Sequence, residues 1–214
     1  PKKPFLLVSS NMGAANNNDP YYEVYNKAKS MDYFNRDPKL FDEKFGRVSE
    51  QYLTIASFIK AITFISKNNN DYDIVVRPHP AENIEAWKTY LKDVPNVYVI
   101  RKDSISFWVD KCFAVMHNGC TTALEATVSQ NPLISYMAYE QKYSYQLTNK
   151  LGKIVKSEIE LLETVNQYFK DRNNLNAKKL ENQKYEFIQN KILIDKKELA
   201  SEKIVKLWET LYSE

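Results

Sequence analysis

The sequence has few cysteines and no long apolar run, and both absences narrow the kinds of protein that it can encode. Its 214 residues include only Cys112 and Cys120, which have neither the number nor the spacing of a disulfide framework or a zinc site. No apolar run approaches the ~20 residues that span a bilayer, and the first residues lack the apolar stretch of a secretory signal. We therefore expect a cytoplasmic protein in a reducing compartment.

The motifs of several common ligand sites and catalytic sites are also missing. The chain has no P-loop and no G-x-G-x-x-G, so no local sequence supports a bound nucleoside triphosphate or dinucleotide. Metal ligands at recognisable spacing are absent, and spacing alone assembles no Ser-His-Asp triad and no acid–base pair of carboxylates. The net charge of +3 is too small to indicate nucleic acid. We expect no metal or other cofactor and no nucleic-acid partner.

What the sequence does have is an alternation of short apolar runs with longer segments of helical period. Hydrophobic residues make up 43% of the chain and charged residues 27%, which is the composition of a folded protein. The alternation is typical of βαβ units and predicts an α/β fold, with a Rossmann-like parallel sheet of about six strands flanked by helices. The predicted strands are Phe5–Ser9, Ile74–Arg77, Val97–Ile100, Phe113–Met116, Leu133–Ser135 and Lys153–Val155.

The predicted helices lie between these strands and make up the C-terminal part of the chain. They cover Val48–Ser66, Ile84–Leu91, Ser104–Asp110, Glu158–Lys170, Ala177–Gln189 and Glu198–Tyr212. The first connection, residues 10–47, is unusually long, and we expect a loop that is helical only near its start. Loops of this length are more often functional than idle. Residues 1–214 are expected to form one domain with a helical tail over about 157–214.

Three turns that follow predicted strands carry the candidate site residues. Ligands of open parallel sheets bind at the carboxyl ends of the strands, so the residues after each strand are where a site is expected. Both histidines of the chain and two of its four glycines lie there. The candidates are Asn11 and Gly13 after the first strand, Arg77, His79 and Pro80 after the second, and His117, Asn118, Gly119, Thr121, Thr122 and Glu125 after the fourth.

The turn over His117–Glu125 indicates an anion site. A strand, a glycine turn and a threonine-rich helix start together place free backbone N–H groups and the positive end of a helix dipole at one point. Thr121 and Thr122 add hydroxyl donors, and Asn118 adds an amide donor. The alternative is a plain helix cap, because Thr122 and Glu125 have the spacing of a capping box.

The other two turns give weaker indications. In Arg77-Pro78-His79-Pro80 the two prolines stiffen the backbone, which suits preorganised binding by Arg77 and His79. The alternative is a strand ended by proline with a solvent-facing histidine. Asn11 and Gly13 are ordinary turn formers, so a ligand is not needed to explain them. Ser104 and Ser106, after the third strand, are expected to cap a helix or contact a base, with capping favoured.

The second and fourth turns together resemble a known enzyme family. A strand that ends in Arg-Pro-His-Pro, followed about forty residues later by a strand and His-Asn-Gly-Cys-Thr-Thr-Ala-Leu-Glu-Ala, is similar to the C-terminal domain of GT-B glycosyltransferases of the bacterial surface-polysaccharide type. Residues 5–16 resemble the segment with which that domain begins, and residues 200–204 resemble its closing helix. The likeness runs from about residue 5 to 206, although only the two turns are specific.

This resemblance implies a donor domain that holds the phosphate of a nucleotide sugar. In that picture, contacts to phosphate come from His79, Asn118, Thr121 and Thr122, contacts to ribose from Glu125, and contacts to the base from backbone near Ile100, Arg101 and Lys102. Similar His-Pro turns occur in enzymes with cytidine donors, so a CMP-linked sugar of the Kdo or sialic acid type is expected.

The chain is half the size of a complete enzyme of this type. A missing N-terminal domain is therefore expected to bind the glycan or lipid-linked acceptor, at the inner face of the membrane, and to supply the general base. Two alternatives remain open. One is a UDP-sugar 2-epimerase, which needs several acid–base carboxylates. The other is a non-catalytic module that contacts a partner through its Lys-rich helices, although their Lys and Glu are mixed.

Overall fold

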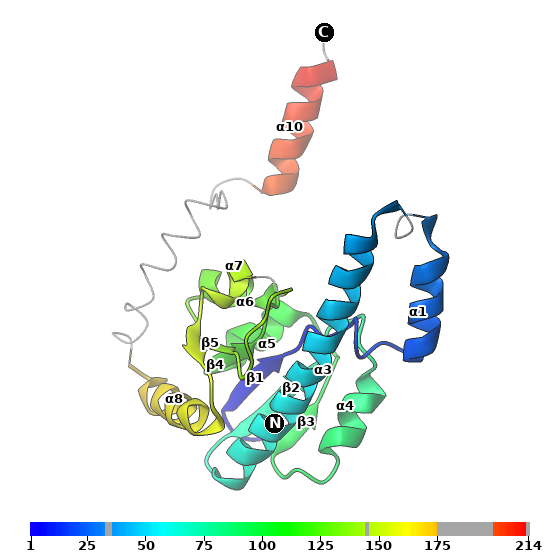
Figure 1. Cartoon of the computed structure of the whole chain (residues 1–214). Helices are drawn as coiled ribbons and strands as arrows, with labels where there is room; N and C mark the ends of the chain where they lie inside the picture. Colours follow the sequence, from blue (N-terminus) through cyan, green and yellow to red (C-terminus); the bar gives the residue numbers. More distant parts are fainter. Residues whose placement is uncertain (33–35, 144–145, 175–198, 213–214) are drawn as a thin grey trace.

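Six short strands form one parallel sheet at the centre of the computed structural model (Figure 1). The structure describes residues 1–32, 36–143, 146–174 and 199–212. The strand order is β3-β2-β1-β4-β5-β6, and every neighbouring pair is parallel. The strands are β1 (Phe5–Ser9), β2 (Asp73–Arg77), β3 (Val97–Val99), β4 (Ala114–His117), β5 (Leu133–Tyr136) and β6 (Lys153–Val155). The predicted fold class and number of strands are confirmed.

Helices cover both faces of the sheet, because the side chains of successive strand residues point to opposite faces. Leu6 and Val8 of β1 face one helical layer, and Phe5 and Leu7 face the other. The first layer contains α3 (Pro38–Lys67), α4 (Ile84–Leu91) and α8 (Glu158–Asp171). The second contains α5 (Ile105–Lys111) and α6 (Thr122–Val128). The remaining described helices are α1 (Tyr21–Ser30), α7 (Gln146–Asn149) and α10 (Ala200–Tyr212).

The long first connection is helical over more of its length than the sequence predicted. The helix α3 begins at Pro38 rather than at Val48, since Asp37 accepts a hydrogen bond from the backbone N–H of Lys39 and proline occupies the first turn. Aromatic contacts then hold α1 against this extension, with Tyr25 beside Phe41 and Phe45. The expected functional loop is therefore largely a pair of helices that projects beyond the sheet (Figure 1).

The predicted C-terminal tail is partly incorporated into the packed body. Leu161 and Val165 of α8 are buried in the first layer, and Glu158 pairs with Lys60 of α3 at 3.0 Å. The predicted helix over residues 177–189 lies outside the described residues, whereas α10 matches the last predicted helix. Within the described part of the chain, no helix combines the length and the apolar character needed to cross a bilayer.

We expect replacement of Phe58 by alanine to lower the free energy of unfolding by about 3–5 kcal/mol, because a fully buried ring leaves a cavity when removed. Phe58 is 0% exposed in the face of α3 that packs on the sheet, next to Tyr136 with ring centroids 5.8 Å apart. Leu53 of the same helix is 50% exposed, so Leu53→Ala is the matched control and costs less than about 1 kcal/mol. Urea unfolding of both variants measures the difference. Equal losses would contradict this packing.

Candidate functional site

The carboxyl ends of β2, β1 and β4 lie side by side, and their three following turns form the candidate site. These strands are neighbours in the sheet, with Ser9 opposite Arg77 on one side and His117 on the other. The turn after β1 also approaches the His-Pro turn closely, because a Cβ atom on Gly13 would lie 3.2 Å from the Cβ of Ala81. The three segments picked out in the sequence are therefore brought together.

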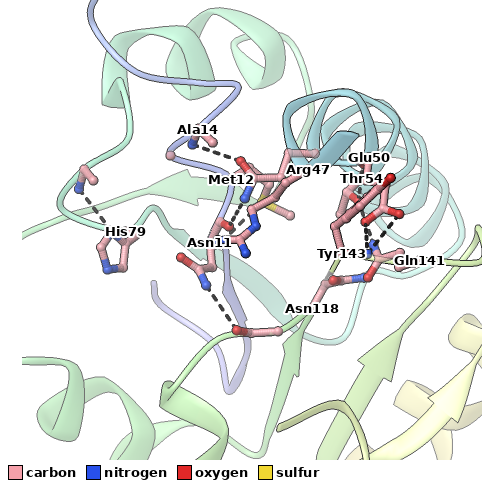
Figure 2. Close-up of a pocket in the computed structure, with 14 residues that line it drawn as sticks. Asn11, Met12, Ala14, Arg47, Glu50, Thr54, His79, Asn118, Gln141 and Tyr143 are labelled. Carbon is pink, nitrogen blue, oxygen red and sulfur yellow. Dashed lines mark hydrogen bonds between the residues drawn. The ribbon is translucent and has the colours of Figure 1, made fainter. Parts of the chain in front are cut away.

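Two cavities open on either side of these turns, and His79 lines both. The helix-side cavity, of about 270 Å³, lies between the turns and α3 (Figure 2). Its lining includes Asn11, Gly13, Arg47, Glu50, Gln51, His79, Asn118, Gly119, Gln141 and Tyr143. The turn cavity, of about 210 Å³, lies between the His-Pro turn and the start of α6. Its lining includes Ser10, Arg77, His79, Pro80, Thr121, Thr122 and Glu125.

The ring of His79 is held in one orientation by its own turn. The backbone N–H of Ala81 donates to His79 Nδ1 at 3.1 Å, as Figure 2 shows. A neutral ring with Nδ1 as acceptor carries its proton on Nε2. The exposed imidazole of His79 thus presents an N–H donor at the boundary between the two cavities.

A buried carboxylate, that of Glu82, ties the site segments together. Glu82 is 1% exposed, and its Oε1 accepts from Ser10 Oγ at 2.7 Å and from the backbone N–H of His79 at 3.1 Å. Its Oε2 accepts from Trp87 Nε1 at 2.7 Å and from Asn16 Nδ2 at 3.4 Å. Nothing in the sequence singled out Glu82, because its partners Ser10 and Asn16 lie more than sixty residues away in the chain.

Two arginines lie behind the His-Pro turn and make the site electropositive. A guanidinium nitrogen of Arg77 donates to the carbonyl of Asp103, and one of Arg101 donates to the carbonyls of His79 and Glu82. The Nε atoms of both arginines are buried and have no hydrogen-bond partner among the described residues. Burial, and secondly the charge of Arg101, lower the pKa of Arg77 from its ordinary value. Carbonyl oxygens offset these charges only in part, which favours an anion in the turn cavity.

The backbone of residues 100–102, expected to contact a base, is engaged elsewhere. The N–H of Ile100 donates to the carbonyl of Val76 at 3.0 Å, which extends the β-sheet ladder. The carbonyl of Lys102 accepts from Trp108 Nε1 at 2.7 Å. Ile100, Arg101 and Lys102 line neither of the two cavities. Their expected contact with a base stays a prediction.

The glycine turn after β4 is fixed from three directions. Gly119 has a φ of 64°, which an L side chain rarely adopts, and its N–H donates to Asn149 Oδ1 at 2.7 Å. Its carbonyl accepts from Asn11 Nδ2 at 3.1 Å (Figure 2). Asn118 Nδ2 donates to the carbonyl of Tyr136 at 2.8 Å, so one of its amide protons is engaged within the protein. The turn is preorganised before any ligand arrives.

The start of α6 does not form the capping box that its sequence allows. Thr121 is the N-cap, but no side-chain hydrogen bond caps the helix, and Glu125 accepts from Ser106 Oγ at 2.8 Å instead. Thr121 is exposed in the turn cavity. The hydroxyl of Thr122 is buried and accepts from Ser9 Oγ at 3.0 Å. Thr121 therefore faces the turn cavity, whereas Ser106 orients Glu125 and Ser9 engages Thr122.

His117 is a core residue, which corrects its expected place in the site. Its side chain is fully buried, Nε2 lies 3.1 Å from Ser135 Oγ, and Nδ1 has no partner among the described residues. Burial lowers the pKa of His117 to about 3. The imidazole is therefore neutral at physiological pH and has no surface with which to touch a ligand in either cavity.

Sequence reasoning missed the α3 side of the site, although the predicted helix Val48–Ser66 contained Glu50 and Gln51. Gln51 accepts from the backbone N–H groups of Ala14 and Ala15 and donates to the carbonyl of Asn11, at 2.9 to 3.2 Å. Glu50 accepts from the N–H groups of residues 142 and 143. The helical period places Glu50 and Gln51 on α3, but nothing local indicated the loops that they hold. Ser104 was predicted correctly as the cap of α5.

Metal binding receives no support from the described geometry. Among the described residues, no three His, Cys, Asp or Glu side chains are grouped as metal ligands would be. The absence of a metal requirement stays a prediction.

No protein-family model matches this sequence, and neither does any curated protein. Solved structures share its fold. The spinosyn rhamnosyltransferase SpnG is similar with a TM-score of 0.50 and 11% identity, over 86% of this chain and 41% of its own. The calicheamicin glycosyltransferase CalG4 gives 0.46 and 14%, over 86% and 37%. The glycosyltransferase VinC, in complex with DTDP, gives 0.47 and 10%, over 87% and 38%.

At these identities the likeness concerns the fold alone. The six-stranded parallel sheet with its flanking helices matches one Rossmann-like half of a GT-B fold. The chain spans about two fifths of the length of the structures that it matches.

We expect Glu82→Ala to lower the free energy of unfolding by about 3 kcal/mol or more, since buried donors on Ser10, His79 and Trp87 lose their acceptor. Glu85, in the first turn of α4, is a matched control. Its carboxylate is exposed and, among the described residues, pairs with Lys88. Glu85→Ala changes stability by less than about 0.5 kcal/mol. Urea unfolding of both variants measures the difference. A loss of unfolding free energy in Glu82→Ala as small as that in Glu85→Ala would contradict the role of Glu82.

The buried imidazole of His117 makes stability depend on pH. The unfolded chain binds a proton at His117 below its ordinary pKa of about 6.5, whereas the native chain does so only near 3, so stability is lost as pH falls through this window. Between pH 7 and pH 5 this residue contributes a loss of about 2 kcal/mol. The variant His117→Gln lacks this loss. Urea unfolding of both proteins at pH 7 and pH 5 measures the difference in unfolding free energy. Identical pH dependence in both proteins would refute the buried neutral state.

Proposed function

We propose that this chain is the donor-binding domain of a glycosyltransferase and holds the phosphate of a nucleotide sugar between the turn cavity and the helix-side cavity. The observation that carries the proposal is the position of His79, which lines both cavities and whose Nδ1 is held by Ala81, so that Nε2 is its N–H donor. A phosphate at the boundary between the two cavities accepts from His79 and lies next to the exposed Thr121. These donors are fixed before binding, so they need little reorganisation.

The charge around the turn cavity supports an anionic ligand. Arg77 lines the cavity, Arg101 lies behind the His-Pro turn, and Glu125 is the single carboxylate of the lining. Glu125 is already oriented by Ser106, which suits an acceptor for ribose hydroxyls. The nucleoside then lies in the turn cavity, and the sugar extends from the phosphate into or past the helix-side cavity, which Gln141 also lines.

Sugar transfer breaks the bond between the anomeric carbon and the phosphate oxygen while an acceptor oxygen attacks that carbon. Negative charge develops on the departing phosphate, where the N–H and hydroxyl donors stabilise it. We assign the acceptor site and the general base to a further domain. A CMP-linked sugar of the Kdo or sialic acid type, used in surface polysaccharide synthesis at the membrane, is the donor that the Arg-Pro-His-Pro resemblance favours.

A binding panel with one matched pair of variants tests this function. Calorimetric titration with CMP, CDP, UDP, DTDP and GDP is expected to show binding of at least one, with a rise in apparent melting temperature. His79→Ala weakens that binding about tenfold or more, because a charge-assisted hydrogen bond is lost. His79→Gln, which keeps a side-chain N–H donor, recovers part of the affinity.

Circular dichroism and urea unfolding serve as controls, because His79 is exposed and its replacement leaves the fold intact. Unchanged affinity in His79→Ala would defeat the role of this residue. Failure of every nucleotide in the panel to bind would defeat the function itself.

A further inference from the structure

A third cavity lies at the carboxyl ends of β5 and β6, beyond the site described above. This lysine cavity has a volume of about 510 Å³. Its walls are the loop after β5, the end of α7 and the edge of β6, and its polar lining consists of Tyr139, Glu140, Gln141, Asn149, Lys150 and Lys156. None of these residues except Gln141 lines the other two cavities.

The lysine cavity is connected to the proposed phosphate site by two side chains. Gln141 lines both the helix-side cavity and the lysine cavity. Asn149 lines the lysine cavity and accepts the N–H of Gly119 at 2.7 Å, so it touches the turn that borders the phosphate. The two cavities therefore adjoin, and a group attached to the phosphate and directed toward β5 lies beside the lysine cavity.

The lysine cavity has more unused donors than unused acceptors. Neither the ammonium of Lys150 nor that of Lys156 makes an ion pair or hydrogen bond with another described residue. Asn149 is 3% exposed, and its Nδ2 is buried without a partner. On the acceptor side, Gln141 Oε1 is also unpaired, and Glu140 is the one carboxylate of the lining. The balance of charge is +1, from two lysines and one glutamate.

We infer that the lysine cavity receives the sugar of the donor and that Lys150 and Lys156 recognise the carboxylate that a sugar of the Kdo or sialic acid type carries. The inference rests on the proposed function, which places a nucleotide sugar in the adjoining cavities. Ammonium groups suit a carboxylate, and Glu140 and Gln141 supply acceptors for the hydroxyl groups that every sugar carries. A neutral sugar would leave both lysines without a counter-charge.

The test compares two sugars that differ in one carboxylate, on the nucleotide that binds best in the panel. For a uridine donor the pair is UDP-glucuronate and UDP-glucose, and for a cytidine donor it is CMP-N-acetylneuraminate and its methyl ester. Calorimetric titration is expected to show about tenfold tighter binding of the acidic member. Lys150→Gln with Lys156→Gln reduces this preference to less than about twofold and leaves affinity for the free nucleotide unchanged.

The matched control is Lys88→Gln with Lys92→Gln, which removes the same charge at the far edge of the sheet, at the end of α4. This control keeps the preference for the acidic sugar. Nucleotide binding without that preference, or a preference that survives loss of Lys150 and Lys156, overturns the inference and leaves the proposed function standing. Absence of nucleotide binding overturns both.

Discussion

The positions of Ser10 and of the His-Pro turn depend on the buried carboxylate of Glu82. It joins the turn after β1, through Ser10, to the backbone of the His-Pro turn and to the indole of Trp87. A buried charge is stable only when its oxygens are hydrogen-bonded, and here four donors satisfy them. Because those donors come from three segments of the chain, the segments are held at one distance from each other, and the ring of His79 is held with them.

The helix α3 provides the same kind of constraint on the opposite side of the helix-side cavity. Two successive residues, Glu50 and Gln51, hold two different loops by their backbone groups, after β1 and after β5. The cavity is thus lined by loop segments that side chains of α3 hold by their backbone N–H groups. Such an arrangement suits preorganised binding, since little conformational entropy remains to be lost when a ligand enters.

His117 and Gly119 lie two residues apart at the end of β4 but have different roles in the fold. His117 ends β4 inside the core and is neutral there, whereas Gly119, two residues later, adopts a left-handed conformation and brings the chain to the surface. The difference arises from the alternation of side chains along a strand and from the turn that follows it. His79, by contrast, lies beyond the last ladder pair of β2 and is exposed.

The sequence by itself determined the fold class, six strands and the convergence of three turns, because these follow from hydrophobic period and from the rule that parallel strands share a carboxyl edge. It also indicated that Gly13 and Gly119 permit close approach or a positive φ. Tertiary structure alone decided that Glu82 holds the turns, that His117 is buried, and that the lysine cavity adjoins Gly119 through Asn149. Those facts depend on contacts between residues far apart in the chain, and no local pattern encodes such contacts.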